Sequence, residues 1–505
     1  MWFKTKPSMI CASIKFAWIL IKGSFGNTGV PSGIALMAAA IVGCALSAIF
    51  SGTEFSLRQL LEGGFGYFDT ILVSVTAMIF IKGLEHSGAL DYLSVSLVKI
   101  FRKFPTVLIL AFMFILMLPG MITGSSLASV ISAGAIVAPI MKKMGLPKAK
   151  VAGIIAFGAI LGMVAPPINI PVMVICDVVD IPYSGFNLPL LVLTFPLAIF
   201  CAIFLSRTFK KSETERKVNK LENIIILGVL GLGLVALAIA TLITGKELLS
   251  TLLIIFAILY AGIVVIMLVG KPYCAEINLE ELQNDEDIKF DVVKELNLTV
   301  LIPILVLVIL FVLQNLFPMV IGRLGTPLLF VIAFIFTIFF GRKHDTIKVL
   351  KEGTKSSISA MGLLIGVGMF VQVMTLTGAR ALFVFNVITI PNPWQYVAIA
   401  IALPLFGGIS AFGSASILGG PFVMSLLAYN EIIVASALSF FAALGEFLPP
   451  TAMSATFAAE KVDDKDATDE NKVKALSVTK SSIVPLLVCL VYALIFIIVL
   501  SKRAL

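Results

Sequence analysis

The chain has 505 residues, of which 59% are hydrophobic and only 13% charged, and it carries a net charge of +8. Soluble proteins contain about 25% charged residues, so this composition excludes a soluble domain and indicates an integral membrane protein. Lys and Arg cluster in short loops between apolar runs, which indicates membrane orientation rather than a nucleic-acid-binding stripe. The six cysteines form no CxxC pair and there are two histidines, so we expect neither a disulfide framework nor a His-rich metal centre.

The N-terminal segment, residues 1–32, combines Lys4, Lys6, Lys15 and Lys22 with short apolar stretches. It lacks the uninterrupted apolar run of a signal peptide. We expect an amphipathic helix that lies on the membrane surface, with an additional span as the alternative.

A membrane-spanning helix needs about 20 apolar residues. Apolar runs of about this length predict spans at 33–50, 69–88, 188–206, 222–244, 248–270, 298–318, 323–340, 357–376 and 482–500.

Two segments, 104–141 and 394–428, each consist of two short apolar arms around a stretch rich in glycine and serine. Lys and Arg flank the first segment on both sides, whereas the flanks of the second carry neither. Because cytoplasmic loops collect Lys and Arg, we expect two re-entrant hairpins, the first entered from the cytoplasm and the second from the outside.

Two further segments, 150–179 and 432–458, are long enough to cross but carry Pro166-Pro167 and Pro449-Pro450 in the middle. Proline removes a backbone donor and clashes with the preceding turn. Each segment is therefore predicted to be two half-helices joined by unwound backbone.

The chain also repeats itself. Ile34–Ala89 aligns without a gap to Leu324–Ala379, at an offset of about 290, with Glu62-Gly63 opposite Glu352-Gly353. An odd number of predicted crossings separates the two copies, so they are expected to be inverted. We therefore expect an all-α integral membrane protein of about 11 spans with inverted-topology repeats, two re-entrant hairpins and two Pro-Pro-broken helices.

The loop charges and the repeat together predict the organisation of the chain. The expected parts are residues 1–32 as the amphipathic segment, 33–207 as the first inverted repeat, 208–322 as a linker with three membrane helices and an acidic loop, and 323–505 as the second inverted repeat. Lys502 and Arg503 fit this topology poorly, because it places them outside the cell and Lys and Arg usually collect on the cytoplasmic side.

Unwound backbone at membrane depth is stable only where it lines a cavity or is buried in protein, so the hairpin tips and breaks should converge. Helix amino termini suit a carboxylate there, and freed carbonyls and hydroxyls suit Na⁺; the alternative is that small residues only let helices pack closely. The expected substrate-binding residues are Thr123, Ser125, Ser126, Asn169, Ser410, Ser414 and Thr451. The expected Na⁺ ligands are Gly124, Ser129, Pro166, Gly413, Ser416, Glu446 and Pro449.

Glu446 is the most informative of these residues. It lies three residues before Pro449, near the predicted midplane, and the equivalent residue of the first copy is the neutral Met163. A carboxylate inside the membrane is expected to bind a cation or a proton. The alternative is a carboxyl group that only hydrogen-bonds the Pro-Pro break.

Other charged residues near the span ends have structural interpretations. Lys82 and Glu85 lie at i,i+3 spacing, which favours an ion pair over a ligand set with His86. Arg380 is expected to be a snorkelling anchor at the outer surface.

The pattern of the first hairpin and break resembles the large membrane subunit of tripartite ATP-independent periplasmic (TRAP) transporters, the DctM-like family. The resemblance rests on the run Thr123–Ser129, on Gly134, Pro139, Lys142 and Gly145, and on Pro166-Pro167. It implies paired hairpins, an elevator mechanism, and transport of carboxylates such as C4-dicarboxylates, commonly with Na⁺. It also implies two partners, a small membrane subunit and a periplasmic substrate-binding protein.

Two residues depart from the pattern of this family. Ile168 replaces the Ser that usually follows the first Pro-Pro pair, and Leu448 replaces the Thr that usually precedes the second. Both positions lie near the cation sites of the family, so Glu446 could replace a missing ligand.

The sequence therefore predicts a secondary transporter of a small organic anion in the bacterial inner membrane, coupled to Na⁺ and without another cofactor. The alternatives are a stand-alone carrier of the same superfamily and an H⁺-coupled carrier or antiporter that uses Glu446. A membrane-embedded enzyme is a remote alternative, because the chain shows no catalytic set, and without a P-loop it has no direct use for ATP.

Overall fold

The computed structural model describes residues 32–51, 57–209, 220–244, 247–274, 296–317, 324–426, 428–449, 451–463 and 472–501. The expected surface helix at 1–32, most of the acidic loop and the two basic residues at the carboxyl end lie outside these ranges.

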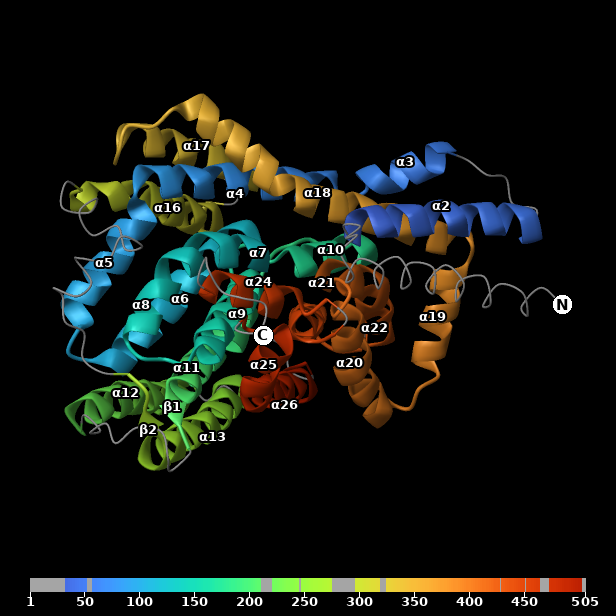
Figure 1. Ribbon diagram of the computed structural model, residues 1–505. Helices are drawn as coiled ribbons and strands as arrows, with labels where there is room; N and C mark the ends of the chain where they lie inside the picture. The colour runs from blue at the N-terminus through green and yellow to red at the C-terminus, as the bar shows by residue number, and fades with distance from the viewer. Residues whose placement is uncertain are drawn as a thin grey trace.

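The described residues form an all-α membrane protein, as predicted (Figure 1). Seven of their helices are long and apolar enough to cross a membrane, or eight if the bent pair α3 and α4 is one span. Shorter apolar helices supply the other crossings, in agreement with about 11 spans. The strands β1 (Arg207–Thr208) and β2 (Lys271–Pro272) form one short antiparallel pair.

The helices follow the predicted duplication. The first repeat contains α2 (Ser32–Ser51), α3 (Leu57–Phe65), α4 (Phe68–Ser87), α5 (Ala89–Phe101), α6 (Pro105–Thr123), α7 (Ser126–Ser129), η1 (Val130–Gly134), α8 (Ala135–Lys143), α9 (Lys148–Val164), α10 (Ile170–Val179) and α11 (Asn187–Leu205). The second contains α17 (Thr326–Phe339), α18 (Thr346–Leu376), α19 (Ala379–Ile388), α20 (Asn392–Gly407), α21 (Ala411–Ser414), η4 (Ala415–Gly419), α22 (Gly420–Ser425), α23 (Glu431–Leu444), η5 (Gly445–Phe447), α24 (Met453–Val462), α25 (Ala475–Ser481) and α26 (Ile483–Leu500). Between them lie α12 (Lys220–Thr244), α13 (Glu247–Val269), η2 (Leu298–Leu301) and α16 (Ile302–Leu316).

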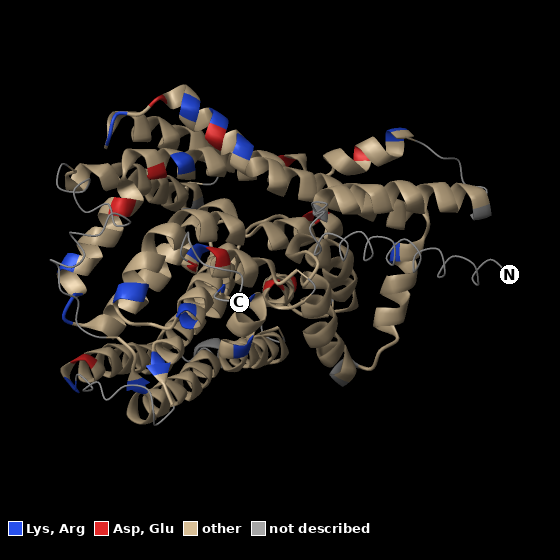
Figure 2. Ribbon diagram, viewed as in Figure 1, with Lys and Arg blue, Asp and Glu red and all other residues tan. Residues whose placement is uncertain are grey.

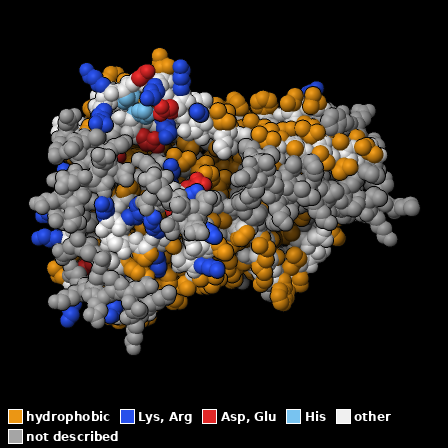
Figure 3. All heavy atoms as spheres, viewed as in Figure 1, with side chains coloured by type: hydrophobic (Ala, Val, Ile, Leu, Met, Phe, Trp, Pro, Cys, Tyr) orange, Lys and Arg blue, Asp and Glu red, His pale blue; other side chains and the backbone are white. Residues whose placement is uncertain are grey.

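The two repeats are inverted relative to each other. Gly88 and Gly378 occupy the same place between α4 and α5 and between α18 and α19, and both adopt a left-handed conformation with φ of 81° and 72°. In Figure 1, α5 lies at the left end of the molecule and α19 at the right end. Most Lys and Arg residues lie toward the left in Figure 2, and the histidine side chains also lie there in Figure 3. The left end is therefore the cytoplasmic side by the positive-inside rule.

The helices α2, α3, α4, α17 and α18 pack together along one side of the molecule, and we call this layer the scaffold. Its helices approach closely because glycines face one another. A Cβ atom at Gly33 would lie 2.5 Å from the backbone of Gly362, and one at Gly353 would lie 2.7 Å from the backbone of Ile79. Small residues of this kind let membrane helices pack at backbone distance.

Both re-entrant hairpins are present. Hairpin 1 runs from α6 through α7 and η1 to α8, and hairpin 2 runs from α20 through α21 and η4 to α22. A four-residue α-helical turn followed by five residues of π-helix occurs at the same place in both second arms. The helices broken at the Pro-Pro pairs are α9 with α10 and α23 with α24, and we call the two interruptions break 1 and break 2.

Three details differ from the sequence prediction. α18 begins at Thr346 rather than at 357, because Asp345 caps it and the basic residues that follow project from its first turns at the cytoplasmic end. The helix α3 occupies part of the segment between the predicted spans 33–50 and 69–88. The first arm of hairpin 1 continues through Pro119 to Thr123, so two residues, Gly124 and Ser125, separate it from α7.

The inverted topology predicts that equivalent loops of the two repeats react from opposite sides of the membrane. Arg102 and Thr389 end α5 and α19, and both are exposed. In a background without the six native cysteines, we expect an impermeant thiol reagent to label Arg102→Cys from the cytoplasm and Thr389→Cys from the outside. Labelling of both cysteines from one side would contradict the inversion.

Candidate functional site

An open pocket lies where both hairpin tips, break 2 and the scaffold meet. Ser125 and Ser126 line it from hairpin 1, Ser410 from hairpin 2, and Glu446 and Thr451 from break 2. Each of these residues stands at a helix end or in unwound backbone, so free polar groups converge on this space.

The scaffold forms the opposite wall of the pocket. Ser356, Ser359 and Leu363 line it from α18 and Met78 from α4. The pocket is therefore bounded by two layers, of which one contains the hairpins and breaks and the other the long scaffold helices. We call the hairpins together with α9, α10, α23 and α24 the hairpin unit.

Each hairpin is held against the broken helix of its own repeat. The backbone N–H of Ile168 donates to the carbonyl of Met121 at 3.2 Å, and at the equivalent place the N–H of Thr451 donates to the carbonyl of Gly408 at 3.1 Å. These bonds satisfy unwound backbone that would otherwise be unpaired at membrane depth.

Paired glycines make this approach possible. A Cβ atom at Gly120 would lie 2.7 Å from the backbone of Gly162, and one at Gly407 would collide with the carbonyl of Ala442. Gly445, the counterpart of Gly162, in turn leaves no room for a Cβ against Gly407. The hairpin arm and the broken helix thus lie backbone against backbone in both repeats.

Glu446 connects hairpin 1 to break 2. Its side chain is only 6% exposed, and its Oε2 accepts a hydrogen bond of 2.5 Å from the hydroxyl of Ser126 and a second one from the hydroxyl of Ser454. Both donors come from elements that end at the pocket. The carboxyl group is thus buried in a polar setting and belongs to the pocket wall.

We call Ser126, Glu446 and Ser454 the acidic cluster. The residues at the equivalent positions of the duplicated structure are not polar. The duplication places Ala411 opposite Ser126, Met163 opposite Glu446, and Pro171 opposite Ser454. The acidic cluster therefore occurs once, although the surrounding backbone is duplicated.

A family model, the tripartite ATP-independent periplasmic transporter, DctM component, matches residues 24–502. The chain belongs to this family. Members of this family are components of transporters. No curated protein matches the chain. Among solved structures, the YdaH transporter of Alcanivorax borkumensis is similar with 14% identity and a TM-score of 0.46 over 97% of each chain, a similarity too distant to carry an inference.

The remaining substrate candidates of this DctM chain make bonds inside the protein. The Thr123 hydroxyl donates to the carbonyl of Pro119 at 2.7 Å. Asn169 caps α10 by accepting from Val172 at 3.0 Å, and its amide nitrogen donates to the carbonyl of Val164. The Thr123 hydroxyl also accepts from the backbone N–H of Ser125 at 3.2 Å. These side chains hold the tip and the break in shape and do not themselves line the pocket.

The Na⁺ candidates also fall into different settings. Ser129 is fully buried at the junction of hairpin 1 and α9, and its hydroxyl has no hydrogen-bond partner. Its counterpart Ser414 donates to the carbonyl of Leu403 at 2.8 Å. Ser416 bonds the hydroxyl of Tyr67 at 2.6 Å, which ties hairpin 2 to the scaffold. Gly124, Pro166, Gly413 and Pro449 supply backbone at the tips and breaks.

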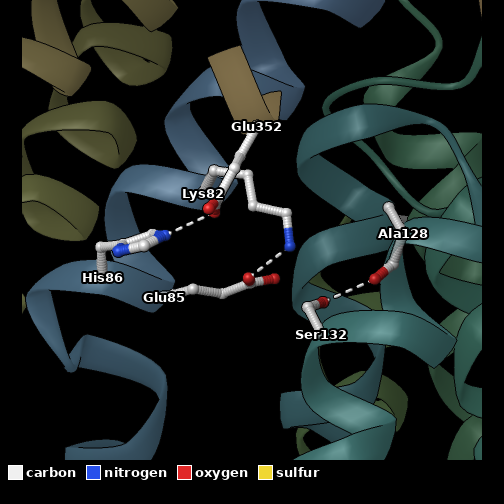
Figure 4. Close-up of polar contacts among 6 residues, drawn as sticks. All are labelled: Lys82, Glu85, His86, Ala128, Ser132 and Glu352. Carbon is white, nitrogen blue, oxygen red and sulfur yellow. Dashed lines mark hydrogen bonds and ion pairs between the residues drawn. The ribbon is translucent and has the colours of Figure 1, made fainter. Parts of the chain in front are cut away.

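The predicted ion pair near the cytoplasmic end is present. Lys82 and Glu85 lie 2.5 Å apart, and His86 bonds Glu352 of α18 at 2.7 Å (Figure 4). Arg380, near the start of α19, is partly buried, and its guanidinium donates to the carbonyl of Val178 at the end of α10.

Sequence reasoning missed the scaffold wall. Ser356 and Ser359 occupy a long helix with no interruption, and only packing shows that they face the hairpin tips. Their spacing of three residues on α18 is the only local signal, and it is common in helices.

The glycine contact predicts that Gly407→Ala disrupts hairpin 2. The new methyl group would overlap the carbonyl of Ala442, and overpacking costs typically about 1–3 kcal/mol. We expect a lower thermal midpoint of the purified protein. Gly228→Ala on α12 is the control, because nothing lies within 4 Å of its Cβ position, and it should leave the midpoint unchanged or raise it. Equal effects of the two changes would contradict the backbone contact.

Two serine substitutions separate the pocket wall from internal bonds. Ser125→Ala is expected to weaken substrate or cation binding several-fold without unfolding, since it removes a hydroxyl that lines the pocket and a lost hydrogen bond costs about 1 kcal/mol. Ser414→Ala is expected instead to lower the thermal midpoint, because its hydroxyl bonds the carbonyl of Leu403. Transport titrations and thermal unfolding measure the two effects. Wild-type transport in Ser125→Ala would limit this residue to packing.

Proposed function

We propose that this DctM chain is the large permease subunit of a TRAP-type secondary transporter that carries a small organic carboxylate with Na⁺. The observation that carries the proposal is the pocket, which both hairpin tips, break 2 and scaffold helix α18 line together. A substrate that binds between two layers can cross the membrane when one layer moves past the other.

The tips supply groups for a carboxylate. The second arms of both hairpins begin at the pocket, after Ser125 and Ser410. The first N–H groups of a helix have no partner within it and carry partial positive charge, so they stabilise an anion. The Ser410 oxygen accepts from Gly413 at 3.0 Å and thereby orders the second tip.

Ser129 is the best candidate for a Na⁺ ligand. An unpaired hydroxyl in a fully buried position costs free energy unless a bound group satisfies it. Hydroxyl and carbonyl oxygens are hard ligands that suit a small cation, and Ser129 lies where hairpin 1 packs against the end of α9 that leads into break 1. We assign the coupling ion to this junction of hairpin 1 and break 1.

The movement is proposed to be elevator-like, with the hairpin unit sliding along the scaffold. Polar contacts join the two layers toward the outer end, from Tyr67 to Ser416 at 2.6 Å and from Thr70 to Asp177 at 3.4 Å. Transfer of the pocket toward the outside has to break these contacts.

The proposal includes the setting of the complex. Members of this family work with other TRAP subunits, so we propose a small membrane subunit and a periplasmic substrate-binding protein as partners in a bacterial inner membrane. A stand-alone carrier of the same superfamily is the alternative, and transport without partner proteins would favour it.

Ion-driven uptake tests the function. In proteoliposomes, with and without candidate partner proteins, we expect an inward Na⁺ gradient to drive the uptake of labelled carboxylates. Ser129→Ala should raise the Na⁺ concentration for half-maximal uptake several-fold, because the cation loses one ligand worth about 1 kcal/mol. Glu446→Gln should keep the Na⁺ dependence.

Different results would identify a different coupling ion or site. Uptake driven by a pH gradient alone, and lost in Glu446→Gln, would establish the H⁺-coupled alternative with Glu446 as the proton site. A strong loss of Na⁺ affinity in Glu446→Gln would place Na⁺ on this carboxylate instead. Absence of uptake under every gradient and with every partner would contradict the transport function.

A further inference from the structure

The helices of the linker between the two repeats are divided between the two layers. The helix α16 lies against α17 of the scaffold, where the ring of Phe311 packs edge-to-face on Phe330 at 5.8 Å. The helices α12 and α13 lie on the opposite side of the molecule from α17 and α18, against α6 and α11 (Figure 1). Helices of one linker therefore pack on different layers.

Most of the surface of α12 faces away from the rest of the chain. Within Lys220–Thr244, the buried side chains are Glu222 and Ile226, and a large apolar side chain such as Leu242 is 85% exposed. The hydroxyl of Tyr260 on α13 donates to the carbonyl of Leu227 at 3.1 Å, so the two helices are joined to each other. Little apolar packing fixes this pair to the hairpins, and its position depends on polar bonds at the cytoplasmic end.

Glu222 bonds α12 to the base of hairpin 1. It is 3% exposed, and its Oε1 accepts from the backbone N–H groups of Thr106 and Val107 at 2.5 and 3.0 Å. These N–H groups belong to the first turn of α6, which begins at Pro105, and the first N–H groups of a helix have no partner within it. Glu222 supplies that partner from another helix.

Arg207 bonds the segment after α11 to both linker helices. Its side chain is 1% exposed, and its Nη1 donates to the carbonyls of Met267 and Gly270 at 3.2 and 2.9 Å. Carbonyls at the end of a helix such as α13 have no partner within it. Its Nη2 donates to the side-chain oxygen of Asn223 on α12 at 2.8 Å. We call Glu222 and Arg207 the linker latch.

The segment after α13 also contacts the hairpin unit. Lys150, in the first turn of α9, donates to the carbonyl of Arg207 at 3.3 Å, and its ammonium lies 5.5 Å from the ring centroid of Tyr273. The backbone N–H of Tyr273 donates to the carbonyl of Ser206 at 3.1 Å. Since α9 is part of the hairpin unit, these contacts connect α13 to the layer that moves under the proposed function.

We propose that α12 and α13 belong to the moving layer and move together with the hairpin unit, held by the linker latch. The inference rests on the elevator-like movement of the proposed function and assigns two further helices to it. If α12 and α13 stayed in place, each transfer would leave the buried groups of the latch without partners, which is costly. A shift of two apolar helices in the bilayer can instead be accommodated by tilting and local thinning of the bilayer.

Cross-links in proteoliposomes test the inference, with the full chain in a background without the six native cysteines. The pair Lys150→Cys and Tyr273→Cys joins α9 to the end of α13, and the pair Val107→Cys and Glu222→Cys joins hairpin 1 to α12. A short bifunctional thiol reagent that a reductant cleaves makes each link, and loss of free thiols confirms it. We expect both cross-linked proteins to take up labelled carboxylate as fast as their reduced forms, because neither link joins parts that move apart.

A cross-link between the layers is the matched control. The pair Thr70→Cys and Asp177→Cys joins α4 of the scaffold to α10 of the hairpin unit, across a contact of 3.4 Å between side-chain oxygens. The same reagent should abolish uptake in this variant, and the reductant should restore it. Loss of uptake in either linker pair, with recovery on reduction, would overturn the inference, because α12 or α13 would then stay in place while the hairpin unit moves.

The inference and the proposed function fail in different ways. Reversible loss of uptake in a linker pair would exclude α12 or α13 from the moving layer and leave the transport function in place. Uptake that continues with Thr70→Cys and Asp177→Cys cross-linked would overturn the elevator-like movement and the inference with it. Absence of uptake of every carboxylate by the wild type would overturn the proposed function itself.

Discussion

The arrangement of the pocket depends on backbone contact between each hairpin and the broken helix of its own repeat. Gly120 against Gly162 and Gly407 against Gly445 remove the Cβ atoms that would keep these segments apart. The close approach lets Ile168 and Thr451 donate their N–H groups to the hairpins. An unpaired amide in hydrocarbon costs several kcal/mol, so helices can be interrupted at this depth only with such partners. The tips and breaks are therefore stable together, and neither would be stable alone.

The sequence predicts the backbone of this arrangement well. Run length, loop charge and the Pro-Pro pairs predict both hairpins, both broken helices and the inversion, because each is a property of a local segment. The helices α3, α5 and α19 are missed because their apolar runs are shorter than a span. The start of α18 is missed because its first turns are charged and lie at the membrane surface.

The site is predicted less completely, for a physical reason. Hydroxyls near a tip are equally suited to face the pocket or to bond the nearest carbonyl, and the sequence does not distinguish the two. Ser125, Ser126 and Thr451 line the pocket, whereas Thr123 and Asn169 bond locally. Contacts between distant segments leave no local signal at all. Tyr67 and Ser416 are 349 residues apart in the chain and still share a hydrogen bond.

The duplicated backbone and the single acidic cluster have different roles. Two inverted copies of one hairpin and one break supply both faces of a site near the midplane. The charge does not repeat, since Glu446 has Met163 as its counterpart. Under the proposed function, a substrate carboxylate and the carboxyl group of Glu446 share one buried pocket. Movement of the hairpin unit through the low-dielectric layer is costly for uncompensated charge, so it favours a bound cation or proton that keeps the moving site close to neutral.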